Sequence, residues 1–237
     1  MAYDGQTVLA VVPARGGSKG IPHKNLRRVG GLSLVAHAAQ TARSLSWIDA
    51  AIVSTDDEQI AAEARAHGLD APFMRPADLS SDTANSVGMW CHAWKAAEKY
   101  YGKRFDISVL LEPTSPMRHP ADVTDTVRAL LAGNHKAAVT VSPAAAHFTP
   151  QKCLTVTDGL VGFYHDAGAQ HSLRQSVPRY YFRNGVCYAL QRGALLTEGR
   201  ILGDDTVGVI LQRPIINIDE PLDLELAEFL INRELRR

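Results

Sequence analysis

Residues 7–25 read TVLAVVPARGGSKGIPHKN, an apolar and partly β-branched run that passes directly into a basic, glycine-rich loop. A short apolar run without alternation is typical of a strand buried on both faces of a parallel sheet. The loop then lies at the carboxyl end of that strand, where open α/β sheets bind their ligands. We therefore expect residues 7–13 to form the first strand of an α/β domain and the loop to hold a ligand.

Apolar strands and amphipathic helices alternate along most of the remaining chain. Ser33 and Pro120 are expected at the first positions of their helices. Thr55 or Asp56 is expected to cap another helix, which Gly68 ends. The pattern predicts strands over residues 50–54, 107–111, 136–141 and 186–190, and helices over residues 33–46, 84–101, 120–133 and 221–233. Alternation of this kind predicts a three-layer α/β/α fold on a mostly parallel sheet.

The alternation stops at about residues 142–185, which are rich in His, Pro, Gly and aromatic residues. The stretch contains too many large apolar residues for a disordered linker. We expect an excursion from the sheet, with short strands around residues 153–156 and 160–164, that covers a site or a partner subunit. Residues 1–237 are then one domain that carries this excursion.

Composition excludes several classes of function. The chain has 237 residues, and its 25 Lys and Arg residues balance 25 Asp and Glu residues. Nucleic acids and anionic membranes are therefore not expected as partners, because both bind proteins through excess positive charge. The polar start of the chain does not resemble a signal peptide, and the three separated cysteines indicate neither a zinc site nor a disulfide framework. We expect a cytoplasmic protein.

The chemistry of the glycine-rich loop suits a polyphosphate. Arg15, Lys19 and Lys24 supply positive charge, Ser18 supplies a hydroxyl, and a glycine-rich turn exposes backbone N–H groups that can face an anion. The spacing fits neither a Walker A loop nor a dinucleotide-binding fingerprint. The alternative is a solvated loop of scattered charges.

Six further segments follow this loop in a characteristic order. They are VSTDD at 53–57, RPADLSSDTANS at 75–86, LEPTSPMR at 111–118, RQ at 174–175, NGVCY at 184–188 and NIDEPLD at 217–223. Together with the loop they resemble the CMP-sugar synthetases that activate sialic acids and related nonulosonic acids. The resemblance spans nearly the whole chain.

The resemblance implies a fold like that of the nucleotide-diphospho-sugar transferases, which is Rossmann-like, and a homodimer joined by the excursion. It also implies that CTP binds at the first loop. The residues implied for the phosphates and ribose are Arg15, Ser18, Lys19, Lys24 and Asn25, and those implied for cytosine are Arg75, Ala84 and Ser86. Ala84 and Ser86 also suit the start of a helix that Asp82 or Thr83 caps.

For the acidic sugar, the resemblance implies Glu112, Arg174, Asn184 and Tyr188. Family members more often carry Gln at the position of Glu112. A carboxylate there could alter the sugar substituent that is accepted, approach Mg²⁺, or pair with Arg118 or Lys19. Members of the sialic acid type often carry a second Arg where this chain has Phe182, which argues against ordinary N-acetylneuraminate as the substrate.

A Mg²⁺ site is implied at Asp219 and Asn217, where the family commonly has two aspartates separated by one residue. An extended backbone would place both side chains on one face, although an amide is a weaker ligand than a carboxylate for a hard cation. The alternative for Asp219 is a cap on the helix that begins at Pro221. Asp56 and Asp57 also follow a strand, and we favour helix capping over metal binding for them.

The reaction implied is cytidylyl transfer, in which CTP and an acidic nine-carbon sugar give a CMP-sugar and pyrophosphate. Lys19, Arg15 and Asp219, with Mg²⁺ as cofactor, are the expected catalytic groups. Two alternatives stay open. One is a nucleotidyltransferase with another acceptor such as 3-deoxy-manno-octulosonate, and the other is a non-catalytic, nucleotide-binding regulatory protein.

Overall fold

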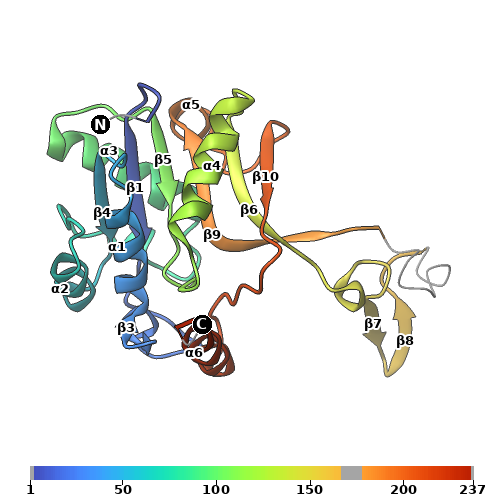
Figure 1. Ribbon diagram of the computed structural model, residues 1–237. Coiled ribbons are helices and arrows are strands. Elements are labelled where there is room, and N and C mark those ends of the chain that lie inside the picture. Colours follow the sequence, from blue (N-terminus) through green and yellow to red (C-terminus); the bar gives the residue numbers. More distant parts are fainter. Residues whose placement is uncertain (1–2, 167–177, 236–237) are drawn as a thin grey trace.

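A six-stranded sheet in the order β10-β6-β9-β5-β1-β4 forms the centre of the structure, a computed structural model that describes residues 3–166 and 178–235 (Figure 1). Its strands are β1 (Val8–Pro13), β4 (Ala50–Ser54), β5 (Ile107–Leu110), β6 (Ala137–Pro143), β9 (Tyr181–Gln191) and β10 (Thr206–Ile210). Only β9 runs against its neighbours β5 and β6 in this sheet, and the other pairings are parallel. The predicted mostly parallel sheet is confirmed.

Helices cover both faces of the sheet. On one face lie α1 (Leu34–Ser44), α2 (Glu58–Ala66) and α4 (Pro120–Ala132), and on the other lie α3 (Ser86–Tyr101) and α5 (Arg192–Leu196). Successive residues of β1 explain how one strand contributes to both layers. Val8, Ala10 and Val12 pack into the first layer, whereas Leu9 and Val11 pack into the second, because side chains of a strand alternate between faces. The predicted three-layer α/β/α fold is confirmed.

Two tryptophans anchor the second layer. Trp90 and Trp94 of α3, expected in a core or an interface, are fully buried beneath the sheet. The indole nitrogen of Trp90 donates a hydrogen bond to the hydroxyl of Ser108 on β5, at 2.8 Å, so its polar group is satisfied inside the core.

The last helix, α6 (Pro221–Leu235), closes a separate apolar cluster. It packs against a small hairpin of β2 (Arg28–Val29) and β3 (Leu32–Ser33). The cluster therefore combines residues from the N-terminal and C-terminal parts of the chain. The buried members of the cluster are Ile21, Val29, Leu34, Ile218 and Ala227. Within the described ranges, no helix has the length and apolar character needed to cross a bilayer.

The helix ends match the sequence in part. Ser33 caps α1 by accepting from the N–H of Ala36, and Pro120 begins α4, as predicted. Asp57 caps α2, which confirms the capping role favoured for it, although Thr55 or Asp56 was expected at the cap position itself. The cap of α3 was predicted wrongly, since Asn85 occupies that position. The periodic pattern locates a helix only to within a few residues, whereas a cap must directly precede the first helical residue.

Three other elements were missed or misjudged. The sequence predicted neither α5 nor the edge strand β10, because five residues are too few to show a periodic pattern. The strand expected over 186–190 is longer, since β9 begins at Tyr181. Its first residues pair with the end of β6 as the chain returns from the excursion.

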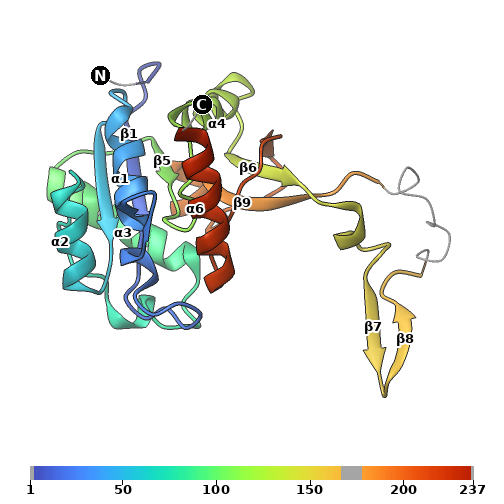
Figure 2. The same ribbon diagram turned by 60° about the horizontal axis from the view of Figure 1, so that its bottom comes forward.

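The excursion contains an antiparallel hairpin of β7 (Leu154–Thr157) and β8 (Leu160–Phe163), which confirms both predicted short strands. The hairpin projects away from the layered body in both views (Figures 1 and 2). Asp158 and Gly159 form its turn with positive φ angles of 51° and 78°, the backbone that tight hairpins with a right-handed twist require.

Candidate nucleotide site

Two adjoining cavities lie at the carboxyl ends of the parallel strands. The larger, of about 530 Å³, is lined by the glycine-rich loop, by residues 112–114 after β5, and by Asp219. The smaller, of about 230 Å³, is lined by residues of the segment between β4 and α3. Pro13, Arg15, Ser86 and Glu112 line both cavities, so the two form one continuous site.

All the residues predicted to bind CTP line these cavities. Those around the larger cavity are Arg15, Ser18, Lys19, Lys24, Asn25 and Ser86, and those around the smaller are Arg15, Arg75, Ala84 and Ser86. Residues that are up to about seventy positions apart in the chain are brought together because the strands that precede them end at the same edge of the sheet.

The cations of the glycine-rich loop have defined partners. Arg15 Nη1 and Lys19 Nζ lie 3.0 and 2.7 Å from the two carboxylate oxygens of Asp82. Lys24 Nζ lies 3.0 Å from the carboxylate of Asp219. The buried amide of Asn25 donates to the carbonyl of Arg15 at 2.9 Å. These contacts argue against the alternative of a loop with scattered, solvated charges.

Arg75 is held rigidly at the back of the smaller cavity. Its side chain is 7% exposed and donates to the hydroxyl and the carbonyl of Ser54, at the end of β4. Burial lowers its pKa to about 10. A guanidinium fixed in this way presents its remaining donors in one direction, which suits recognition of a planar polar group.

Glu112 differs from its neighbours because its carboxylate is unpaired. Within the described residues it forms no hydrogen bond and no ion pair, although it lines both cavities. The expected alternative of pairing with Lys19 or Arg118 is therefore absent from this part of the chain. Lys19 contacts Asp82, and Arg118 donates to main-chain carbonyls instead. Burial raises the pKa of Glu112, and the charge of Arg118 partly opposes this shift.

A bulge in β9 brings the chain against Glu112. The pairing of β6 with β9 shifts register between Val139 and Val141. Gly185 lies within the bulge with φ of 70°, and a Cβ atom there would overlap with the Glu112 carboxylate. Position 185 requires glycine for two reasons. Its backbone is left-handed, and the Glu112 carboxylate occupies the space that a Cβ atom would need.

Asn184 supports this bulge from inside. Its side chain is fully buried. The Oδ1 atom accepts from the hydroxyl of Thr140 at 2.7 Å and from the N–H of Val186 at 3.2 Å, and Nδ2 donates to Ser142 Oγ at 3.0 Å. Asn184 does not line either cavity, and its contact with a sugar stays a prediction.

Of the other two residues predicted to bind the sugar, one is buried in the core and one lies outside the described residues. Tyr188 is 6% exposed and packs in the core beside α3, and burial with the nearby Glu112 charge raises its pKa to about 12. It does not line either cavity. Arg174 lies outside the described residues.

The sequence analysis missed Arg183. The positive charge of Arg183 partly opposes the rise in the pKa values of Glu112 and Tyr188, so it lies near enough to act on both groups. Phe182, at the position where an Arg is common in the family, is 47% exposed. Strand alternation was the available signal, because adjacent residues of a strand face opposite sides. Asp82, considered only as a helix cap, was also missed as the partner of the loop cations.

The two residues predicted for a metal do not meet at the cavity. Asp219 lines the larger cavity with its carboxylate 71% exposed. Asn217 does not line it, and its buried Oδ1 has no hydrogen-bond partner in the structure described. Residues 214–219 form no strand, and the structure does not bring the two side chains to one cavity. Among the described contacts, the Asp219 carboxylate pairs with Lys24 and accepts from no N–H group of α6, so the expected alternative of a helix cap is not observed. Asp223 instead accepts from the N–H groups of Asp219 and Glu220.

The carboxylates at the cavity nevertheless fit one divalent cation. Residues 3–166 and 178–235 contain no cluster of three or more His, Cys, Asp or Glu side chains that could hold a metal alone. Mg²⁺ is usually bound by one or two carboxylates together with substrate phosphates and water. Asp219 and Glu112 line one cavity with the phosphate-binding candidates, so a metal here needs the nucleotide as a co-ligand.

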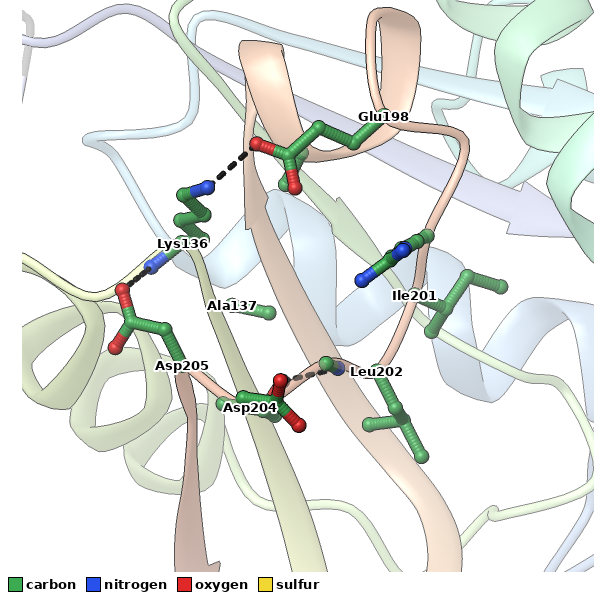
Figure 3. A pocket seen from close by; sticks show the side chains of 11 residues that line it. Lys136, Ala137, Glu198, Ile201, Leu202, Asp204 and Asp205 are labelled. Atoms are coloured by element: carbon green, nitrogen blue, oxygen red, sulfur yellow. Dashed lines mark hydrogen bonds and ion pairs between the residues drawn. The ribbon is translucent and has the colours of Figure 1, made fainter.

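Another cavity, of about 140 Å³, lies where β6 and β10 begin, at the opposite end of the sheet (Figure 3). Lys136 Nζ lies 2.6 Å from the carboxylate of Glu198, and the backbone N–H of Lys136 donates to Asp205. Because these charged groups are already paired with one another, the cavity does not suggest a catalytic or ligand-binding site.

The fold and the strand-end site define a class of α/β proteins that handle nucleotides. The cytidylyltransferase family profile matches residues 9–193. The chain belongs to the cytidylyltransferase family, whose members are nucleotidyltransferases. This confirms the resemblance to CMP-sugar synthetases that the motifs indicated.

Individual relatives agree. Post-translational flagellin modification protein B of Campylobacter coli is 30% identical over 229 residues, covering 96% of each chain. The CMP-N,N'-diacetyllegionaminic acid synthase of Legionella pneumophila is 30% identical over 94% of this chain and 96% of its own length. In fold, the chain is similar to a CMP-2-keto-3-deoxy-manno-octonic acid synthetase solved with CTP, with a TM-score of 0.69, 19% identity, and coverage of 96% and 99%.

We expect Glu112→Gln to raise the melting temperature at neutral pH by roughly 2–4 °C, the shift that about 1 kcal/mol produces in a chain of this size. Glutamine keeps the length of the side chain and removes a half-buried, unpaired charge. Because the pKa of Glu112 is higher in the folded than in the unfolded state, wild-type stability falls as pH rises through the folded pKa. The difference from the variant should therefore vanish at acidic pH, where both states hold the proton.

Thermal melts of both proteins from neutral to acidic pH measure this difference. Glu220→Gln, which removes an exposed carboxylate beside the same site, is the matched control and should leave the melting temperature unchanged. Equal melting temperatures of wild type and Glu112→Gln at neutral pH would show that the Glu112 charge does not destabilise the folded protein.

Proposed function

We propose that this protein forms a CMP-sugar and pyrophosphate from CTP and a nonulosonic, sialic-acid-like α-keto acid. The observation that carries the proposal is the pair of joined cavities, one lined by cations and one backed by Arg75. A nucleoside triphosphate needs both kinds of surface side by side. The name of the Legionella relative, a CMP-N,N'-diacetyllegionaminic acid synthase, supports the choice of a nonulosonic acid.

In this proposal the phosphates of CTP lie in the larger cavity and cytosine in the smaller. Arg15, Lys19 and Lys24 offset phosphate charge, with Ser18 and Asn25 beside them. Cytosine has an amino donor next to ring-nitrogen and carbonyl acceptors. The donors of Arg75 and the exposed groups at the start of α3, near Ala84 and Ser86, are suited to that pattern.

The anomeric hydroxyl of the sugar acid attacks the α-phosphorus in line with the departing pyrophosphate. A new bond forms between the anomeric oxygen and phosphorus, and the hydroxyl proton passes to solvent. The bond between the α-phosphorus and its bridging oxygen breaks with the electron pair leaving on pyrophosphate. Proteins accelerate such transfers mainly by positioning and by charge stabilisation. Lys19 and Arg15 are the proposed catalytic cations.

Asp219 is the proposed protein ligand for Mg²⁺, with Glu112 on the same cavity wall. A bound Mg²⁺ neutralises negative charge that develops on the phosphates. The ion pair with Lys24, at 3.0 Å, holds the Asp219 carboxylate at the cavity while no metal competes for it. Asn217 takes no part in this version of the site, because it does not line the cavity.

The sugar acid is proposed to lie beside Glu112, at the junction of the two cavities. Its carboxylate needs a cation. The charges of Arg118, Arg183 and Lys24 all reach Glu112. We propose Arg183, because Arg118 is occupied by main-chain carbonyls and Lys24 by Asp219. An arginine can grip a carboxylate through two parallel hydrogen bonds. Glu112 itself can only accept hydrogen bonds when ionised, so it suits a hydroxyl or an amide N–H of the substrate. Arg174 stays a prediction for the same subsite, and the cytoplasmic location also stays a prediction.

The hairpin of the excursion is proposed to join two copies of the chain. Its register pairs Leu154 with Phe163 and Val156 with Val161, so these four apolar residues share one face. Each is at least 50% exposed. A contiguous exposed apolar face marks an interaction surface, and the predicted homodimer supplies an identical face.

The function is tested by pyrophosphate release from CTP and Mg²⁺, measured with a panel of nonulosonic acids and 3-deoxy-manno-octulosonate. We expect release with one nonulosonic acid and none when ATP, GTP or UTP replaces CTP. Release only with 3-deoxy-manno-octulosonate would select the alternative acceptor. CTP binding without release from any acid would favour a regulatory protein.

Lys19→Ala should lower turnover at saturating CTP by about a hundredfold to a thousandfold, or ~3–4 kcal/mol in barrier, as for the loss of one preorganised charge-stabilising group. Lys99→Ala removes a lysine from the last turn of α3, away from both cavities, and should retain full turnover. Near-normal turnover of Lys19→Ala would remove Lys19 from the catalytic groups.

Asp219→Asn should raise the Mg²⁺ concentration needed for half-maximal turnover at least tenfold, about 1.4 kcal/mol, because an amide oxygen is a weaker ligand than a carboxylate. Titration of turnover with Mg²⁺ measures this, with Glu220→Gln as the neighbouring charge control. An unchanged titration would exclude Asp219 as a ligand.

Val156→Lys should convert the dimer to a monomer, because an unpaired ammonium group would be buried in the joined apolar faces. Light scattering after gel filtration measures the molar mass. Thr155→Lys places the same charge on the opposite face of the hairpin and should remain dimeric. A monomeric wild-type protein would refute the proposed dimer.

A further inference from the structure

One carboxylate neutralises two cations of the larger cavity. Asp82 contacts Arg15 through Oδ1 and Lys19 through Oδ2, at 3.0 and 2.7 Å. Arg15 Nη1 also donates to the carbonyl of Ser81 at 3.0 Å. The segment between η2 (Ala77–Leu79) and α3 is thus docked onto the glycine-rich loop by side-chain and main-chain contacts.

The geometry resembles that of a bound anion. Two oxygens of one group each take one cation, which is how neighbouring phosphate oxygens would meet the same pair. The contact with Lys19, followed by the charge of Arg15, lowers the pKa of Asp82. The carboxylate is therefore ionised at neutral pH and cannot leave the cations by taking up a proton there.

We propose that Asp82 is a built-in competitor for the nucleotide's phosphate groups. This inference rests on the proposed function, because it assumes that Arg15 and Lys19 bind the phosphates. A triphosphate must displace the carboxylate to reach both cations. After transfer, the return of Asp82 to the cations promotes the release of pyrophosphate.

The contacts are weak enough for this exchange. The side chains of Lys19 and Asp82 are 79% and 44% exposed, and exposed ion pairs contribute little to stability because water screens them. A polyphosphate carries several charges and can replace both contacts at once. A ligand with a single phosphate gains less binding free energy when it displaces Asp82, because it can replace fewer of the contacts. Asp82 therefore also favours binding of CTP over binding of CMP.

The test measures binding of inorganic pyrophosphate and of CTP by calorimetry. Asp82→Asn should bind pyrophosphate about three- to tenfold more tightly than wild type, the range expected for removing one or two exposed ion pairs. Its inhibition constant for pyrophosphate in the turnover assay should fall by the same factor. Asp82→Glu retains the charge and should stay close to wild type.

Asp78→Asn is the matched control, because Asp78 carries the same charge in the same segment and forms no ion pair with Arg15 or Lys19. It should bind pyrophosphate as wild type does. A thermal melt of Asp82→Asn establishes that the variant is folded before its affinity is compared.

Unchanged or weaker pyrophosphate binding by folded Asp82→Asn would overturn the inference, since Asp82 would then orient the cations for the ligand. That outcome leaves the proposed function intact if wild type still turns over CTP. Conversely, tighter pyrophosphate binding by Asp82→Asn in a protein that never releases pyrophosphate from CTP would support the competition and refute the proposed function.

Discussion

The antiparallel course of β9 is the constraint on which the rest of the site depends. The strand lies between β5 and β6, which both run the other way, so it returns the chain from the excursion into the edge where the parallel strands end. Buried Arg118 joins it to the loop after β5 by donating to the carbonyls of Glu112, Gly185 and Val186. Removing this guanidinium would leave three carbonyls with fewer partners, and one of them belongs to Glu112, which lines both cavities.

Charge in the site is arranged in exchangeable pairs rather than as a standing positive field. The chain has no net formal charge, and the loop cations are matched by Asp82 and Asp219. In the proposed competition, phosphate binding exchanges one set of partners for another, and this exchange would limit both affinity and retention of products. Glu112 is the exception, a desolvated carboxylate at the junction of the cavities, and its lack of a partner among the described residues is the physical reason to place the acceptor substrate there.

Much of the fold could be predicted because local pattern and topology agree. The apolar run of β1, the cap at Ser33, the proline at the start of α4 and the two strands of the hairpin all followed from short-range chemistry. The cap at Asn85, the short helix α5 and the edge strand β10 did not. Each depends on a few residues whose local preferences are weak, so packing against the sheet decides them.

The sequence by itself determined the family, the fold class and the residues that line the two cavities, because a glycine-rich basic loop follows a buried strand and the family motifs occur in a fixed order. Only the tertiary structure decided which polar side chains face the cavity. Asn184 turns inward to support the bulge, Asn217 lies off the cavity, and Asp82 and Arg183 gain their roles from groups far away in the chain. Orientation of this kind depends on strand register and on long-range hydrogen bonds, which no local pattern of residues records.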